Sequence, residues 1–269
     1  MRRGRTEKVL VQRLRAGTLQ RVPDEVVVEE PLEIRLDGHL VATTMRTPGN
    51  DYELAVGFCL GDGLLGEAKV LSVRYCGQGP AVESEYNVVT VETGGRAPVP
   101  EPRIGNVSSS CGLCGTSTLV DMSTRLAPVG AEVVFRASVL AGIADQVSEH
   151  QDLFTRTGGL HAAGVFTPAG EVELVREDIG RHNAVDKVNG RRLLDGRFDS
   201  GSLGLFVSGR ASFEMVQKAW AAGFGTLVAV SAPSSLAVEA ARAAGMTLAG
   251  FARGGNINLY CGEIELDGP

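Results

Sequence analysis

The regular alternation of apolar runs and segments of helical periodicity after about residue 137 constrains the fold of this chain most strongly. Parallel strands need crossover connections, which are usually helices, and helices on both faces of the sheet bury such strands. The alternation therefore predicts a largely parallel sheet enclosed between helices in a three-layer α/β/α domain. We expect strands at 162–166, 172–175, 203–207, 226–230 and 247–251, and helices at 139–152, 181–194, 212–222 and 235–244.

The first part of the chain has a different rhythm and predicts a smaller α+β domain. Two extended runs, 25–36 and 39–47, flank the dipeptide Asp37-Gly38, which is typical of a tight β-hairpin. We also expect a helix capped by Asn50 or Asp51, with apolar positions at Leu54, Phe58 and Leu65, and strands at 70–76 and 87–92.

Glycine, proline and serine are concentrated in residues 93–110, which predicts a mobile loop after these strands. We therefore divide the chain into two domains. Residues 1–125 form the N-terminal α+β domain, which ends in the mobile loop with its cysteine motif, and residues 126–269 form the α/β domain.

Charge is distributed unevenly along the chain. Residues 1–21 hold seven basic side chains and one acidic one, a net charge of +6, and the total of −6 leaves −12 for the remaining residues. A basic arm could contact an acidic partner or nucleic acid, but a solvated terminal strand is the favoured interpretation, and we expect no nucleic-acid partner.

Neither a secretory signal nor a membrane span is predicted. No apolar run follows the N-terminal arginines, and the longest stretch without charge, 219–238, is interrupted by glycines, a proline and serines. The odd number of cysteines, five, fits a reducing compartment, because a secreted chain more often pairs an even set. We expect a cytoplasmic protein without a membrane partner.

Two cysteines three residues apart, Cys111 and Cys114, lie in a segment rich in serine and glycine. Zinc would need two more soft ligands, and Cys59, Cys76 and Cys261 stand alone in the sequence. A redox pair would be expected at the start of a helix after a strand, and inert cysteines would be expected in apolar elements. Sulfur relay needs an accessible thiolate of lowered pKa in a loop that can reach two partners, which this composition fits.

Two other motifs are typical of binding to a large anion. Arg181 and His182 stand where a loop enters a predicted helix, so backbone amides and a guanidinium would face a phosphate. The turn 208–210 repeats this arrangement at the end of a strand, the usual ligand edge of an open α/β sheet. His182 could instead only satisfy a hydrogen bond. The alternatives for the arginines are surface ion pairs of Arg181 with Glu177 or Asp178, and of Arg210 with Glu214.

Several segments, taken in order, resemble the FdhD family of formate dehydrogenase accessory sulfurtransferases. The resemblance extends from about Val26 to Glu265. It rests on Thr47-Pro48-Gly49, Glu53-Leu54-Ala55, Gly57-Phe58, Cys111-Gly112-Leu113-Cys114-Gly115, Thr157-Gly158-Gly159-Leu160-His161, the run from Glu177 to Lys187, Ser208-Gly209-Arg210, Ser231-Ala232-Pro233 and the run from Phe251 to Asn256.

The resemblance implies a sulfurtransferase that takes sulfur from a cysteine desulfurase. The acceptor of the sulfur would be a bis-guanylyl-pterin cofactor of molybdenum or tungsten. With molybdenum this is the molybdenum bis(guanylyl molybdopterin) cofactor. The sulfurated cofactor would then be inserted into formate dehydrogenase. Cys111 would carry the persulfide and Cys114 would assist its release. A homodimer is also expected from the family. The alternative is a non-catalytic carrier or chaperone that holds the cofactor and docks it onto the dehydrogenase.

The family's cofactor-binding stretch corresponds to residues 251–256, where Arg253 can meet a phosphate or a guanine edge and the adjacent glycines let the backbone approach. A plain β-hairpin turn is the alternative. The candidate cofactor-binding residues are Gly158, Gly159, His161, Arg181, His182, Asn183, Ser208, Gly209, Arg210, Phe251, Ala252, Arg253, Gly254, Gly255 and Asn256.

The family's fold is similar to that of cytidine deaminases, so we expect a cytidine-deaminase-like α/β domain without deaminase chemistry. Zinc deaminases need His-x-Glu and a downstream pair of cysteines. Here the corresponding segment reads His161-Ala162-Ala163, and the later turn 208–212 has no cysteine. We therefore expect no zinc and no other metal ligand, and a pocket that binds a guanine nucleotide without hydrolysing it.

Overall fold

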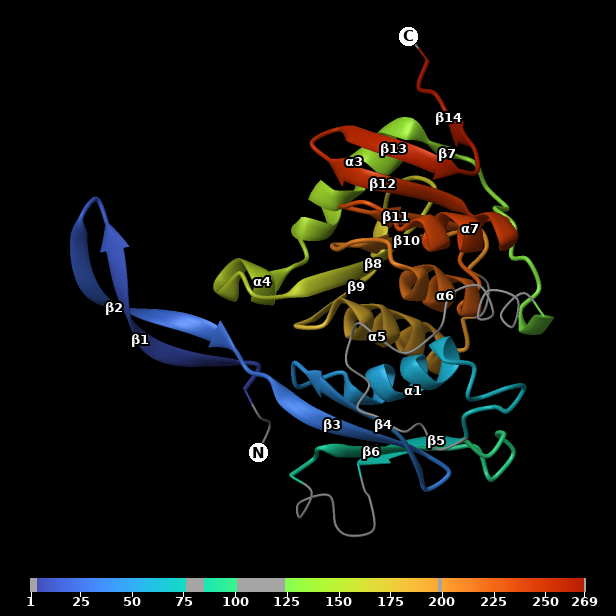
Figure 1. Ribbon diagram of the computed structural model, residues 1–269, viewed down its shortest axis with the longest axis horizontal. Helices are drawn as coiled ribbons and strands as arrows, with labels where there is room; N and C mark the ends of the chain where they lie inside the picture. Colours follow the sequence, from blue (N-terminus) through green and yellow to red (C-terminus); the bar gives the residue numbers. More distant parts are fainter. Residues whose placement is uncertain (1–3, 76–84, 101–123, 198–199, 269) are drawn as a thin grey trace.

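Two sheets, one of four strands and one of six, form the two halves of the protein (Figure 1). The computed structural model describes residues 4–75, 85–100, 124–197 and 200–268. The N-terminal sheet has the order β4-β3-β6-β5, and α1 covers one of its faces (Figure 1). Its elements are β3 (Glu30–Leu36), β4 (His39–Arg46), α1 (Asp51–Gly61), β5 (Ser72–Tyr75) and β6 (Val88–Glu92).

The N-terminal half confirms the hairpin predicted at Asp37-Gly38. These two residues have φ of 47° and 86°, the left-handed values that a tight hairpin turn requires, and β3 and β4 pair antiparallel. Alternate residues of β3 are buried against α1, which is the pattern of a strand with one face in the core. Asn50 precedes α1 as predicted but makes no side-chain cap bond, and Leu65 lies beyond the end of the helix.

The C-terminal sheet has the order β13-β12-β11-β10-β8-β9. Its strands are β8 (His161–Phe166), β9 (Val172–Asp178), β10 (Gly204–Val207), β11 (Thr226–Ala229), β12 (Thr247–Arg253) and β13 (Asn256–Cys261). The helices of this half are α3 (Ala137–Ser148), α4 (Asp152–Thr157), α5 (Arg181–Leu194), α6 (Phe213–Ala221) and α7 (Ser235–Ala243). A short parallel pair, β7 (Phe135–Arg136) and β14 (Ile264–Glu265), completes it.

The prediction of a largely parallel sheet is wrong. Only the β10–β11 and β11–β12 pairs of the described sheet are parallel, whereas β8–β9, β8–β10 and β12–β13 are antiparallel. Short turns at 167–171 and 254–255 join β8 to β9 and β12 to β13, and a tight connection returns the chain antiparallel. The sheet is therefore mixed.

Helices cover both faces of this mixed sheet. One face packs on α5, α6 and α7, with Val165, Leu205 and Leu227 among the buried strand residues. The other face packs on α3, with Phe166 and Phe206 among them. The half is therefore a three-layer α/β/α arrangement, as predicted. No helix of the described residues is both long and apolar enough to cross a membrane.

The two halves meet where α1 crosses α5 (Figure 1). A Cβ atom added to Gly57 would lie 1.8 Å from the backbone oxygen of Asp186, and one added to Gly190 would lie 1.8 Å from that of Glu53. The backbones of the two helices are therefore in direct contact. A buried ion pair lies at the same crossing, where Lys218 Nζ is 2.7 Å from an oxygen of Asp186.

Residues 6–27 form a feature that the sequence analysis missed. β1 (Thr6–Arg15) and β2 (Thr18–Val27) pair antiparallel over their whole length as a separate two-stranded ribbon. The N-terminal segment is thus not a lone solvated strand, and the predicted run 25–36 is divided between β2 and β3. Ala16 and Gly17 form the turn with φ of 46° and 80°. Alanine at such a position is uncommon, which is why the turn was not recognised.

Candidate functional site

Three of the predicted site residues meet at one edge of the C-terminal sheet. His161 begins β8, Arg181 begins α5, and Gly209 follows the end of β10. A Cβ atom on Gly209 would lie 3.2 Å from Arg181 Cδ and 3.8 Å from His161 Cε1. A side chain at position 209 would therefore crowd Arg181 and shift it by a few tenths of an ångström, so glycine leaves this arginine its place at the edge.

Ser208 holds His161 at this edge. Its hydroxyl accepts a hydrogen bond from the backbone N–H of Ala162 at 2.9 Å and lies 3.2 Å from His161 Nδ1. The backbone N–H of Ser208 donates to the oxygen of Ala162 at 2.9 Å. These bonds fix the end of β10 against the start of β8 and orient the imidazole.

Two buried polar atoms at the start of α5 have no hydrogen-bond partner among the described residues. They are Nε of Arg181 and Nδ1 of His182. Gly180 precedes the helix and offers no side-chain cap, so the free backbone N–H groups of the first turn lie beside these atoms. A buried donor without a partner is costly, and a helix N-terminus favours negative charge. The arrangement fits an anionic ligand such as a phosphate.

The ion pairs weighed as alternatives for the arginines are absent from the described part of the structure. Glu177 accepts hydrogen bonds from the backbone N–H groups of Leu153 and Phe154, and Asp178 pairs with Lys187 at 2.7 Å. Among the described residues, the basic side chain within 4.0 Å of Glu214 is that of His182 rather than that of Arg210.

Both histidines of the site are neutral at pH 7. Burial, aided by the charge of Arg181, lowers the pKa of His161. Burial also lowers the pKa of His182 to about 4, with further contributions from Arg181 and Lys218. The positive charge at this edge is therefore supplied by arginine, and each imidazole offers one donor and one acceptor nitrogen.

Asn183 is buried and bonded within the protein. Its side-chain amide donates to the backbone oxygen of Met45 at 2.8 Å and to Asp178 at 2.9 Å. Asp178 also accepts from the backbone N–H of Thr47 at 3.1 Å. Asn183 thus joins the two halves beneath the edge, and a direct bond from its amide to a ligand would require one of these bonds to open.

The segment 251–256 lies beside the same edge. The backbone N–H of Phe251 donates to the oxygen of Ser231 at 3.4 Å, and that of Ser231 donates to the oxygen of Gly209 at 3.3 Å. The segment is the β12–β13 hairpin, so the local structure is the hairpin turn weighed as the alternative. Phe251 is 44% exposed with φ of 55°, an uncommon conformation for a residue with a bulky side chain.

The remaining candidates of this group differ in exposure. Arg210, Arg253, Gly254, Gly255 and Asn256 are exposed, whereas Ala252 is buried and contributes to the core under α3. Gly158 and Gly159 are also exposed and lie between the end of α4 and His161, with a Cβ on Gly159 3.6 Å from Val27.

The predicted catalytic residues, Cys111 and Cys114, lie outside the described residues, as does Cys76. Burial raises the pKa of the Cys59 thiol far above its ordinary value and also raises that of Cys261. These two thiols are therefore protonated at pH 7 and are poor nucleophiles.

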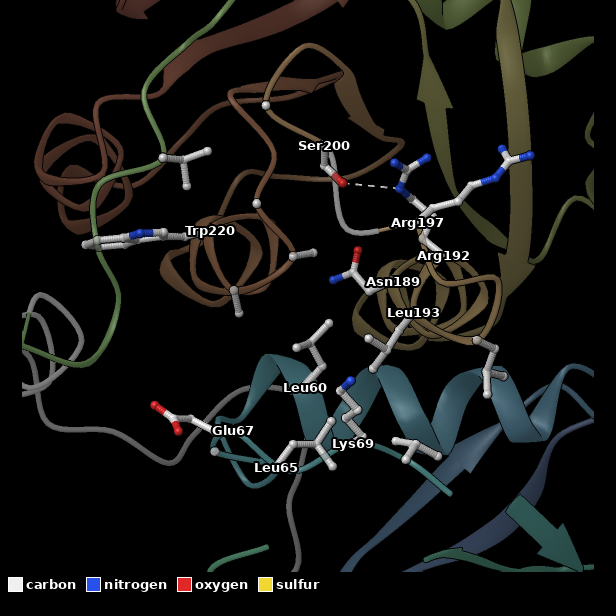
Figure 2. A pocket seen from close by; sticks show the side chains of 18 of the residues that line it. Leu60, Leu65, Glu67, Lys69, Asn189, Arg192, Leu193, Arg197, Ser200 and Trp220 are labelled. Atoms are coloured by element: carbon white, nitrogen blue, oxygen red, sulfur yellow. Dashed lines mark hydrogen bonds between the residues drawn. The ribbon is translucent and has the colours of Figure 1, made fainter. Parts of the chain in front are cut away.

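A cavity lies at the other end of α5 from this edge, where the sequence predicted no site (Figure 2). The cavity has a volume of about 790 Å³ between the ends of α5 and α6 and the segments 60–70 and 127–132. Asn189 is 1% exposed, and its amide oxygen has no hydrogen-bond partner among the described residues. Arg192, three residues further along α5, donates from Nε to Ser200 at 3.2 Å (Figure 2). The lining comes from four separate segments, so no sequence motif marks it.

Comparison with known proteins assigns the class to which this fold and site belong. Residues 27–266 match the model of the FdhD/NarQ family, so the chain belongs to this family and the predicted resemblance is confirmed. Individual relatives are similar over nearly their whole length. The Sulfur carrier protein FdhD of Streptomyces avermitilis is 47% identical over 97% of this chain and 95% of its own.

Two further relatives extend this result. The Sulfur carrier protein FdhD of Nocardia farcinica is 49% identical over 93% of this chain and 91% of its own. A crystal structure described as a formate dehydrogenase accessory protein from Desulfotalea psychrophila matches with a TM-score of 0.76 and 26% identity, covering 96% of this chain and 97% of that one. This chain therefore has the same fold as the solved protein from Desulfotalea psychrophila.

Proposed function

We propose that this protein is a sulfurtransferase of the formate dehydrogenase pathway that carries sulfane sulfur on Cys111. The similarity to proteins named Sulfur carrier protein FdhD, over more than nine-tenths of this chain, carries the proposal. The chemistry of the cysteines supports it, because the described thiols are poor nucleophiles, whereas the Cys111 segment has the polar composition of an accessible loop.

The proposed reaction has two steps, and each balances. The Cys111 thiolate attacks the terminal sulfur of a cysteine desulfurase persulfide, so the sulfur–sulfur bond of the donor breaks and its cysteine leaves as a thiolate. Cys114 then attacks the inner sulfur of the Cys111 persulfide, which forms a disulfide and releases hydrosulfide to the metal of the acceptor. A thiol reductant must reduce this disulfide before the next cycle.

The acceptor in this proposal is the molybdenum bis(guanylyl molybdopterin) cofactor, which is cargo rather than a resident group. The edge formed by His161, Arg181 and Gly209 fits its nucleotide portion, because Arg181 and His182 leave buried polar atoms unsatisfied at a helix N-terminus. Arg181 and the exposed Arg253 would hold its phosphates, and the missing side chain at Gly209 would let them approach. His182 can donate or accept one hydrogen bond without adding charge.

The other partners follow from the same proposal. A cysteine desulfurase would supply the sulfur, formate dehydrogenase would receive the finished cofactor, and the protein would act in the cytoplasm as a homodimer. The cytidine-deaminase-like character of the C-terminal half stays a prediction, which its mixed sheet with helices on both faces supports.

A non-catalytic carrier of the cofactor is the second candidate. The unsatisfied polar atoms of Arg181 and His182 favour it, since this site needs no cysteine to bind an anion. The two candidates differ in whether sulfur becomes covalently attached to the chain.

Intact mass spectrometry after incubation with a cysteine desulfurase and cysteine separates the two. We expect a gain of about one sulfur atom that a reductant removes. The gain should be absent in Cys111→Ala and present in Cys261→Ala, the matched control with a half-buried thiol. Cys114→Ala should gain the sulfur but retain it longer. No gain in wild-type protein would refute the relay and leave the carrier.

A further inference from the structure

We propose that the cavity at the C-terminal end of α5 is a second ligand site, which takes a small organic anion with an apolar body and an N–H or O–H donor. It lies at the opposite end of α5 from Arg181, so it is separate from the edge proposed for the cofactor. Its volume of about 790 Å³ is typical of sites for small molecules. Close-packed cores contain few voids larger than a water molecule, so a space of this size is not a packing defect.

Both halves of the protein contribute apolar walls to this cavity. Leu60 and Leu65 come from the N-terminal half, whereas Leu193 and Trp220 come from α5 and α6 (Figure 2). Leu65 is 4% exposed and Trp220 is 2% exposed, so these walls are held in place by the cores behind them. Sites for small molecules occur preferentially between domains and are lined mostly by apolar side chains. The walls therefore fit the apolar body of a ligand.

One buried hydrogen-bond acceptor belongs to the lining. Asn189 is 1% exposed, and its Oδ1 has no partner among the described residues. Its Nδ2 donates to the backbone oxygen of Lys218 at 2.9 Å. A backbone oxygen can only accept, so the amide cannot turn over and Oδ1 keeps its place. Figure 2 shows this amide between Leu60 and Leu193 on one side and Ser200 on the other. A buried acceptor without a donor is costly, so the ligand should supply an N–H or O–H group.

The charges of the lining favour a single negative charge on the ligand. Three cations and two carboxylates line the cavity, a net charge of +1: Lys69, Arg192, Arg197, Glu67 and Glu132. The two arginines lie 3.8 and 3.7 Å from Glu173, which is outside the lining. Lys69 is exposed and forms no ion pair with a described carboxylate, and its amino group points into the cavity (Figure 2). Lys69 is therefore the cation that we expect to meet the anionic group.

The two carboxylates of the lining lie away from this position. Both Glu67 and Glu132 are exposed, so water and salt screen their charge. A Cβ atom on Gly201 would lie 2.7 Å from Cδ of Glu132, which places that carboxylate over the glycine. The carboxylate of Glu67 points away from Asn189 (Figure 2). Neither side chain opposes an anion beside Lys69.

Simpler occupants satisfy only part of this lining. A water molecule could donate to Asn189, but it would leave the walls at Leu65 and Trp220 in contact with water. An inorganic anion could pair with Lys69, but it would leave the same walls uncovered and carries no donor for Asn189. An organic anion with a donor in its apolar body satisfies the walls, the acceptor and the cation together.

A fluorescent dye with these three features tests the site. The probe is an anilinonaphthalene sulfonate whose amine and sulfonate stand at opposite ends of the naphthalene. Trp220 is the single tryptophan of the sequence and lines the cavity, so energy transfer from its indole to the dye reports binding. We expect saturable binding of one dye per chain, with quenching of Trp220. Excess GDP should not displace the dye, because GDP would occupy the edge at Arg181.

Variants locate the dye within the cavity. Lys69→Met keeps the length of the side chain and removes its charge, so it should weaken dye binding by about two- to fivefold. Lys8→Met is the matched control, an exposed lysine outside the cavity, and should leave the affinity unchanged. Asn189→Leu removes the acceptor and should weaken binding by about fivefold.

Two analogues of the dye test the same contacts in wild-type protein, so they do not depend on the fold of a variant. The phenoxy analogue has an ether oxygen in place of the N–H and should compete with the dye about fivefold less well. Phenylnaphthylamine lacks the sulfonate, so its affinity should not change in Lys69→Met. Four results would overturn the proposal: no saturable binding, displacement of the dye by GDP, an unchanged affinity for the dye in Lys69→Met, or equal affinities for the dye and its phenoxy analogue. Sulfur gain at Cys111 and GDP binding are measured separately, so failure of this site and failure of the proposed function are distinguishable.

Discussion

The contact between α1 and α5 makes a quantitative prediction for Gly57→Ala. In an ordinary helix this substitution stabilises by about 0.5–1 kcal/mol, because alanine loses less backbone entropy than glycine. Here the new Cβ would lie 1.8 Å from the oxygen of Asp186 and 2.8 Å from the nitrogen of Gly190, whereas ordinary contacts begin near 3.4 Å. Both neighbours are backbone atoms, so the helices must separate by about 1.6 Å.

The cost of that separation exceeds the gain in helix propensity. Overpacking in a core costs about 1–3 kcal/mol or more, and a gap of only 0.5–1 Å removes roughly a quarter to a half of a dispersion contact. We expect a net loss of about 2–4 kcal/mol of unfolding free energy. In a chain of this size the loss corresponds to a fall of roughly 4–8 °C in Tm, measured by thermal unfolding.

Two variants make this prediction refutable. Gly142→Ala in α3 is the matched control, because its Cβ would meet no atom within 4 Å, and it should stabilise by about 0.5–1 kcal/mol. Gly57→Ala combined with Gly190→Ala should cost less than the sum of the single variants, since one separation relieves both contacts. A stabilised Gly57→Ala protein, or strictly additive losses, would show that the helices do not touch through their backbones.

Three further predictions concern charged groups. Lys218→Met leaves the carboxylate of Asp186 buried without its cation and should lower the free energy of unfolding in denaturant by about 3–5 kcal/mol. Because burial raises the folded pKa of Asp186 above 3.8, this variant should lose further stability as the pH rises above 3.8, and a stability that does not change with pH would contradict this. Arg181→Met removes a buried donor without a partner, so calorimetry should show GDP binding weakened by about 1.5–3 kcal/mol while Tm stays equal or rises. Arg253→Ala should also weaken GDP binding, with the free energy of unfolding unchanged within about 0.5 kcal/mol. An unchanged affinity for GDP in both variants would place the ligand elsewhere. The folded pKa of His182, about 4, is below its unfolded value of 6.5, so wild-type stability should rise with pH between these values and His182→Gln should flatten that rise in urea unfolding.

Local sequence patterns predicted most elements of the C-terminal half and the hairpin of the N-terminal half. The strand at 226–230 and the helix at 181–194 correspond to β11 and α5 within a residue or two. Asp37-Gly38 formed the predicted turn because the left-handed backbone that a tight hairpin needs is a property of these residue types themselves. Family membership was also readable, since it rests on motifs in a fixed order.

Local sequence patterns could predict neither the direction in which neighbouring strands pair nor the pairing of β1 with β2. Apolar runs such as 162–166 look alike in parallel and antiparallel sheets, because burial on both faces removes the polar alternation that would distinguish them. The β1–β2 ribbon mixes aliphatic and charged residues on an exposed surface, so hydrophobic patterning could not show that its strands pair.

The sequence by itself determined where the charged side chains and the thiols stand along the chain, and it predicted Cys111 as the sulfur carrier and Arg181 and Arg253 as anion ligands, because formal charge and functional group belong to the side chain itself. Only the tertiary structure decided that His161, Arg181 and Gly209 share one edge, that the amide of Asn183 is occupied beneath it, and that α1 and α5 touch at Gly57 and Gly190. These relations join residues far apart in the chain. They depend on how the sheet and helices pack, which no local pattern encodes.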